Sequence, residues 1–171
     1  NDIAVAFRTP MQSAEDIKIN YGAATTFMAS PSEIIEIPLV DGREPKKITS
    51  QALSEVIEPR IKELFELIRN ELQRSRMGNA IASGVVITGG SSMMRGMVNL
   101  GEKVFNMPVR IGIPRDVDGL LQVVENPRYA TAIGLLKMAK EDLSHGESRW
   151  PDGNSVMDLF KKMKMWFQGN F

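Results

Sequence analysis

The sequence predicts an α/β fold in which helices alternate with short apolar strands. Leu and Ile recur at spacings of three and four over residues 49–77, the pattern of a helix with one buried face. The continuous apolar run at residues 84–88 is typical of a strand buried on both faces of a parallel sheet. Asn126-Pro127 then opens a last helix that continues to about Asp142. The alternation of these elements indicates the α/β class.

A helix and a hairpin are expected before the long helix. Residues 10–21 form the helix, and Gly22 ends it. Residues 33–40 are rich in β-branched side chains and form a strand. Asp41-Gly42 turns the chain back, so that residues 43–48 return as the second strand.

The long helix contains Pro59, which either begins a second helix or kinks the first. After the strand at 84–88 and a glycine loop, we expect a helix over 93–105 and a strand over 109–113. Residues 143–154 change to Ser, Gly, Pro and acidic residues, a composition typical of a flexible linker.

Composition excludes several functional classes. The 171 residues carry 21 basic and 21 acidic side chains, so the chain lacks the basic surplus of a general nucleic-acid binder. It has no Cys, and His145, expected in a solvated loop, is its only His, which leaves no multi-His metal site. No run of 18 apolar residues exists. Because the chain opens on Asn1 without Met or a signal-peptide pattern, we expect a fragment of a longer protein.

The glycine loop that follows the strand at 84–88 is a candidate ligand site. Gly89 and Gly90 let the backbone approach a ligand closely, because no Cβ intervenes. A helix that begins at Met93 would add free N–H groups, which suit the sugar or phosphates of a nucleotide. The alternative is a tight strand-to-helix turn that binds nothing.

This segment resembles the adenosine motif of the actin, Hsp70 and sugar-kinase superfamily. The resemblance places Gly89, Gly90 and the hydroxyl of Ser91 against the nucleotide, and Met94 beside the adenine. Residues 14–18 resemble the Ala-Glu-x-x-Lys helix of the same superfamily.

In the superfamily, the Glu and Lys of that helix reach the ribose and the adenine edge. The resemblance assigns this role to Glu15 and Lys18, which share one helical face. The alternative for these two side chains is an ordinary exposed ion pair.

Longer segments resemble the FtsA family of bacterial actin-like cell-division proteins. They are Ile17 to Gly22, Val56 to Arg60, Val109 to Pro114 and Tyr129 to Leu136. The resemblance implies the second large domain of an actin-like ATPase with a small inserted subdomain. ATP would be the ligand, with Mg²⁺ held mainly by the first domain, which is absent here. Any hydrolysis would depend on residues outside this chain, so no catalytic residue is nominated.

The resemblance also divides the chain. Residues 1–22 would hold the nucleotide-contacting helix region of the small subdomain, and residues 23–80 the rest of that subdomain. Residues 81–142 would form the α/β nucleotide-binding subdomain. Beyond the linker at 143–154, residues 155–171 would form a membrane-targeting helix.

Lys46, Lys47 and Arg60 form a candidate partner surface. From the residues alone, a solvated basic face is the simpler interpretation. The family resemblance implies that this subdomain receives the acidic and hydrophobic C-terminal tail of the tubulin-like FtsZ.

The last residues predict an amphipathic helix at a membrane surface. At roughly 100° per residue, one arc gathers the apolar side chains Val156, Leu159, Phe160, Met163, Trp166 and Phe167. Lys162 and Lys164 flank this arc, where they can reach anionic lipid phosphates. The alternatives are docking on the chain's own domain or in a partner groove.

The family resemblance, together with the tail, implies an ATP-binding protein that polymerises on the cytoplasmic face of the inner membrane at the division site. It would tether the FtsZ ring and help recruit later division proteins. A sugar or acetate kinase-like ATPase, and another actin-like scaffold for rod shape or pilus assembly, are the alternatives. A soluble kinase has no need of the Lys-rich aromatic tail.

Overall fold

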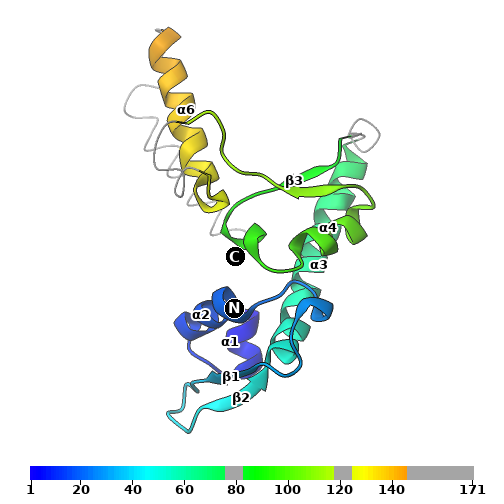
Figure 1. Ribbon diagram of the computed structural model, residues 1–171, viewed down its shortest axis with the longest axis vertical. Coiled ribbons are helices and arrows are strands. Elements are labelled where there is room, and N and C mark those ends of the chain that lie inside the picture. Colours follow the sequence, from blue (N-terminus) through cyan, green and yellow to red (C-terminus); the bar gives the residue numbers. More distant parts are fainter. Residues whose placement is uncertain (76–82, 118–124, 146–171) are drawn as a thin grey trace. The chain divides into compact units, whose positions relative to one another are not determined.

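The computed structural model describes residues 1–75, 83–117 and 125–145, in two compact units, Asn1–Ala130 and Thr131–Phe171 (Figure 1). In chain order the helices and strands are α1 (Asp2–Phe7), α2 (Met11–Tyr21), β1 (Ile34–Ile37), β2 (Lys46–Thr49), α3 (Ser50–Arg74), β3 (Val85–Ile87), α4 (Met97–Phe105), β4 (Val109–Ile111) and α6 (Ala130–His145). Short 3₁₀ turns, η1 to η3, lie at Thr26–Met28, Gly90–Met93 and Pro127–Tyr129.

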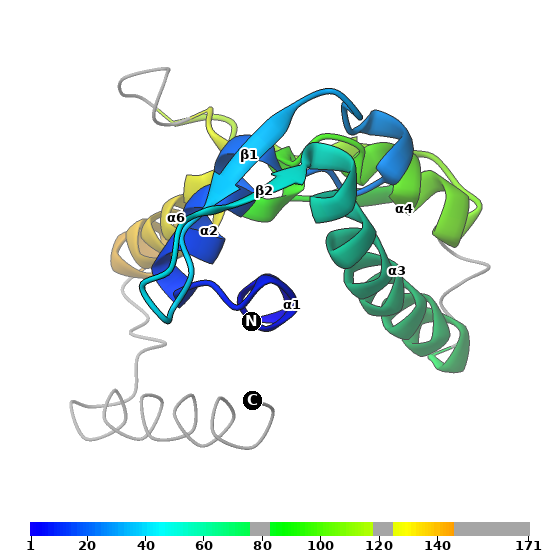
Figure 2. The same ribbon diagram turned by 90° about the horizontal axis from the view of Figure 1, so that it is seen from below.

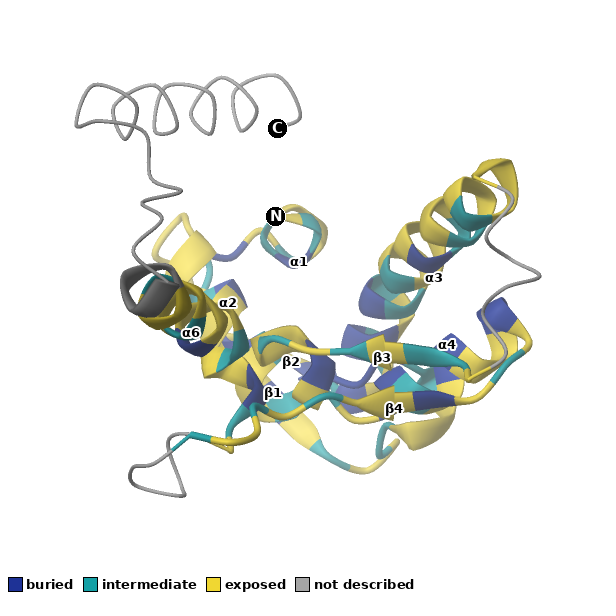
Figure 3. Cartoon of the chain, turned by 90° about the horizontal axis from the view of Figure 1, so that it is seen from above, coloured by how far each residue is buried: buried dark blue, intermediate teal, exposed yellow. Residues whose placement is uncertain are grey.

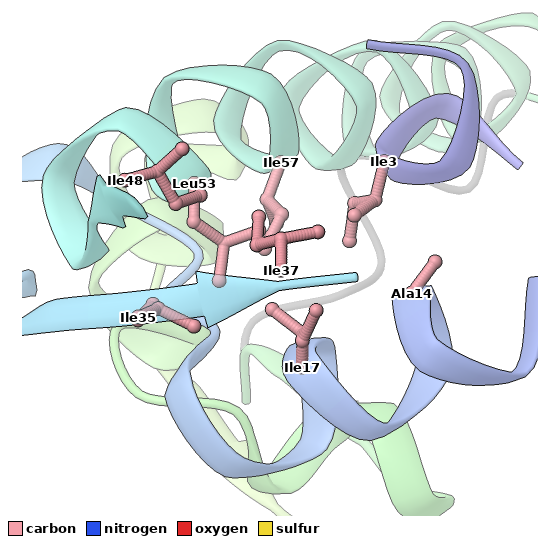
Figure 4. Packing of buried hydrophobic residues seen from close by; sticks show 8 residues of the cluster. All are labelled: Ile3, Ala14, Ile17, Ile35, Ile37, Ile48, Leu53 and Ile57. Carbon is pink, nitrogen blue, oxygen red and sulfur yellow. The ribbon is translucent and has the colours of Figure 1, made fainter. Parts of the chain in front are cut away.

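The first core of unit 1 lies between the hairpin and three helices. The strands β1 and β2 pair antiparallel, with Ile35 opposite Ile48, which confirms the predicted hairpin (Figure 2). Alternate residues of β1 are buried, as expected for a strand with one covered face. In Figure 4, side chains from α1, α2, β1 and α3 point toward one another. The buried members of this core are Ile3, Ala14, Ile17, Ile35, Ile37, Ile48, Leu53 and Ile57.

The long helix α3 connects this core to a second one. Thr49 caps it by accepting a hydrogen bond from the Ala52 N–H at 3.1 Å. Pro59 lies inside the helix, so it does not begin a new one. Ile57 is buried in the first core, whereas Phe65, two turns further along, is buried in the second.

The second core lies between α3, α4 and a parallel pair of strands, β3 and β4, in which Val85 pairs with Val109. The rings of Phe65 and Phe105 lie 5.2 Å apart between centroids. The parallel pairing was predicted, but burial of β3 on both faces was wrong, because Val86 is 50% exposed. No residue of β3 falls in the buried class (Figure 3). Among the described residues this sheet has two strands, and the second core packs against one face of it.

Two predicted boundaries were also wrong. The helix expected from Met93 begins only at Met97. Residues 90–93 form a 3₁₀ turn, Arg95 makes a parallel bridge with Ala23, and Gly96 takes the left-handed conformation at φ 82° before α4 starts. The last helix continues past Asp142 to His145, so this residue ends α6 and does not lie in a loop.

The rest of the predicted linker and the tail, residues 155–171 with all the expected lipid-facing side chains, lie outside the described residues. No helix in the described ranges has the length and apolar character needed to cross a membrane.

Candidate functional site

The glycine loop after β3 is held by hydrogen bonds from both sides. Gly89 has φ 90°, a conformation that favours glycine. Its N–H donates to the Pro127 carbonyl at 3.2 Å, and its own carbonyl accepts from the buried Ser92 hydroxyl at 2.7 Å. Thr88 anchors the start of the loop, because its hydroxyl donates to the Gly112 carbonyl at 2.8 Å. The loop is therefore fixed before any ligand arrives.

The space beside the loop is open. A Cβ added at Gly89 would have no heavy atom within 4 Å, and one at Gly90 would meet only the Arg128 Nε, at 3.9 Å. Neither glycine is required by packing against its own protein. The open side fits a ligand that lies directly against the backbone.

Helix α2 supplies the opposite wall of this space. Its buried face, Ala14 and Ile17, packs into the first core and orients the rest of the helix. Glu15 and Lys18 lie outside that face and form an ion pair, with Nζ and Oε2 2.6 Å apart. The pair is partly exposed, and each side chain keeps further hydrogen-bonding capacity for a ligand.

Between the two walls lies a cleft of about 790 Å³, which falls within the range of roughly 300–1,000 Å³ common for small-molecule sites. It brings together five of the six residues predicted for the nucleotide: Glu15, Lys18, Gly90, Ser91 and Met94. Gly89, the sixth, does not line the cleft but sets the turn that presents Gly90 to it. Segments more than 70 residues apart thus form one site.

Sequence reasoning missed part of the lining: Ile19, Asn20, Gly22, Met93, Arg95 and Arg128. Arg95 is adjacent to the predicted Met94 and could have been included on that ground. Arg128 has no local signal, because the hydrogen bond between Gly89 and Pro127 is what brings its segment to the loop.

The cleft combines apolar and cationic groups. Its lining has three cationic side chains, Lys18, Arg95 and Arg128, and one carboxylate, that of Glu15. Met93 and Met94 offer apolar surface that a flat ring can contact. This set of groups suits a ligand with a planar base, hydroxyls and negative charge. Within the described ranges, no three metal-binding side chains gather into a cluster.

Two of the three predicted partner residues, Lys47 and Arg60, form ion pairs. Lys46 and Lys47 are exposed on β2, and the Lys47 ammonium lies 3.4 Å from a Glu36 carboxylate oxygen. Arg60 on α3 donates to both carboxylate oxygens of Asp2, at 2.7 and 3.2 Å, and to Glu63 at 2.8 Å.

These hydrogen bonds from Arg60 lower the pKa of Asp2, and they raise the pKa of Arg60 above its ordinary value. Arg60 therefore ties α1 to α3, whatever else it binds.

Comparison with known proteins identifies the family. The family model described as "Cell division protein FtsA" matches residues 1–134. Proteins of the same description are 46% identical in Pseudomonas aeruginosa, 37% in Neisseria meningitidis and 36% in Escherichia coli K12, over 99–100% of this chain. The chain belongs to the FtsA family. It spans 42–43% of the length of these relatives, so it corresponds to part of an FtsA protein.

Solved structures show the fold of this FtsA segment. MreB 5 of Spiroplasma citri bound to AMPPNP matches with a TM-score of 0.52 at 18% identity, over 84% of this chain and 43% of that one. The ADP-bound form of the same protein matches with a TM-score of 0.52 at 21% identity, over 84% of this chain and 44% of that one. The predicted actin-like fold is confirmed.

Proposed function

We propose that this chain forms the adenosine-binding side of the ATP site in an FtsA-family cell-division protein. The observation that carries the proposal is the cleft between α2 and the glycine loop, which gathers Glu15, Lys18, Gly90, Ser91 and Met94. The solved MreB 5 structures of the same fold carry AMPPNP or ADP, which agrees with a nucleotide ligand.

Each wall has a separate part in this site. Gly90 leaves room for the nucleoside against the backbone, since nothing closer than the Arg128 Nε at 3.9 Å occupies the position of a Cβ. Glu15 and Lys18 would bind the ribose hydroxyls and the adenine edge, and Met94 would border the base. ATP supplies a polyanion that can bridge domains, and the domain outside this chain would hold its Mg²⁺ and terminal phosphates.

The test uses the full-length protein that carries this chain. Gly90→Val should weaken binding of a fluorescent ATP analogue at least tenfold, because two methyl groups enter the space proposed for the nucleoside. Gly134→Val is the matched control, since a Cβ there also meets nothing within 4 Å and Gly134, on α6, is not among the residues that line the cleft. Equal affinities for both variants would show that the nucleotide does not lie against the loop.

We further propose that the whole protein polymerises on the cytoplasmic face of the inner membrane and tethers the FtsZ ring to it. FtsA-family membership supports the cell-division role. The amphipathic pattern of residues 155–171 supports membrane attachment. One such helix binds weakly, whereas several on one filament bind firmly through effective concentration. Polymerisation and attachment would therefore reinforce each other, and the membrane-bound filament would recruit later division proteins.

A further inference from the structure

Four residues from four segments close a ring of contacts beside the cleft. The guanidinium of Arg95 donates to the Tyr21 carbonyl at 3.2 Å and lies 3.8 Å from the Glu33 carboxylate. The Ser50 hydroxyl donates to the same Tyr21 carbonyl at 3.2 Å, and the Ser50 N–H donates to the Glu33 carbonyl at 2.9 Å. The ring joins the glycine loop, the end of α2, the start of β1 and the start of α3.

Part of this ring is buried. Ser50 is 0% exposed. The Glu33 oxygen that faces Arg95 is also buried, and no hydrogen bond to it exists among the described residues. The Glu33 and Arg95 side chains as wholes are 37% and 50% exposed, so the ion pair alone contributes little. Arg95 is the cation beside the buried oxygen, and the four contacts of the ring act together.

Arg95 is also anchored through its backbone. The Ala24 N–H donates to the Arg95 carbonyl at 2.7 Å, and Ala23 makes a parallel bridge with Arg95. Arg95 lines the cleft itself. Its main chain is therefore part of the cleft wall, while its side chain reaches Tyr21, the last residue of α2, and Glu33, which directly precedes β1.

We propose that Arg95 is a positioning residue that transmits occupation of the cleft to the β1–β2 hairpin. The inference rests on the proposed nucleotide site. A ligand against residues 90–95 restricts Arg95, and the restricted guanidinium holds Tyr21 and Glu33. Ser50 is bound to both and directly follows β2, so the strand that carries Lys46 and Lys47 becomes ordered as well.

Amide hydrogen exchange on the full-length protein tests this inference, with and without saturating ATP. In the wild type, ATP should slow exchange in residues 15–22 and 89–95 and also in residues 33–50. In Glu33→Gln and Ser50→Ala, which change residues outside the cleft lining, the slowing at the cleft should persist under saturation. In these two variants and in Arg95→Ala, the slowing over 33–50 should fall by roughly fivefold, the lower end of typical coupling between sites.

Two matched variants control for general loosening. Ser54→Ala makes the same change one turn along α3, at a residue that is also 0% exposed and whose hydroxyl has no hydrogen-bond partner in the described part of the chain. Glu36→Gln removes an exposed ion pair with Lys47 on the same hairpin. Both should keep the slowing over 33–50.

The outcomes separate the two proposals. If ATP protects the cleft but residues 33–50 respond equally in the wild type and in all three ring variants, or do not respond at all, the role of Arg95 is overturned while the nucleotide site stands. If ATP leaves residues 15–22 and 89–95 unprotected in the wild type, the nucleotide site fails and this inference fails with it.

Discussion

At the scale of single residues, Gly84 shows how one missing side chain permits the parallel strand pair. It has φ 89°, and an added Cβ would collide with the Pro108 carbonyl oxygen. That oxygen also accepts the Val85 N–H at 2.8 Å, the hydrogen bond next to the pairing of β3 with β4. The backbones can approach this closely only because residue 84 has no Cβ.

Gly84→Ala should therefore destabilise the protein by more than about 2 kcal/mol, because left-handed strain of roughly 1–2 kcal/mol adds to the backbone collision. Gly42→Ala is the control, since Gly42 has φ 72° but nothing lies within 4 Å of an added Cβ. Gly42→Ala should lose only the free energy of unfolding that corresponds to the left-handed strain. Urea unfolding of the full-length protein measures both, and equal losses would mean that the Pro108 contact contributes nothing.

The residues of the cleft show what sequence reasoning could find. Gly90, Ser91 and Met94 are part of a recognisable strand–loop motif, and Glu15 and Lys18 are part of a helix motif, so they could be named in advance. Arg128 could not, because it enters the cleft through a hydrogen bond between loops far apart in the chain.

At the scale of elements, local patterns predicted the hairpin, α2 and α3, because their apolar periodicity and end signals agree. The start of α4 was predicted four residues too early, at Met93 and not at Met97, and the cause is not local. Residues 93–96 have a composition compatible with a helix, but the 3₁₀ turn that ends at Met93, the bridge between Ala23 and Arg95, and the left-handed Gly96 delay its start to Met97. The uncovered face of β3 was missed because an apolar run alone does not tell how many neighbours a strand has.

The pair of α1 and α3 gives a test of the proposed FtsZ surface. Arg60→Glu should weaken binding of the FtsZ tail peptide severalfold, because the peptide is acidic and the variant reverses a charge that is 61% exposed. Nucleotide affinity should not change, since Arg60 does not line the cleft. Fluorescence anisotropy with a labelled peptide measures the first effect.

The same substitution also breaks the hydrogen bonds to Asp2, so a control is needed for the loss of that link. Asp2→Asn removes the charge on α1 but keeps Arg60 positive. If Asp2→Asn binds the peptide as well as the wild type and Arg60→Glu does not, the guanidinium itself contacts the peptide. Equal weakening in both variants would assign Arg60 to holding α1 against α3.

At the scale of the whole molecule, unit 1 consists of two small cores that share one helix. Ile61 of α3 packs against both of them. The hairpin with the candidate partner lysines belongs to the first core, and the glycine loop adjoins the second. The cleft lies where segments from the two meet, so a ligand there contacts both. Sequence periodicity predicted the α/β class, but the actin-like arrangement was inferred from resemblance to a family, because periodicity does not fix how elements pack.

The proposed tail provides the last prediction. In the full-length protein, Trp166→Ser should lower the fraction that sediments with anionic vesicles, because full burial of an apolar side chain contributes roughly 1.5–3 kcal/mol. Trp150→Ser is the matched control, since Trp150 lies in the predicted linker and outside the amphipathic arc.

A protein that ends at Ser148 should stay in the supernatant. If it sediments as well as the full-length protein, residues 155–171 are not the anchor. If neither sediments, the tail binds protein, and the partner-groove interpretation replaces the membrane one.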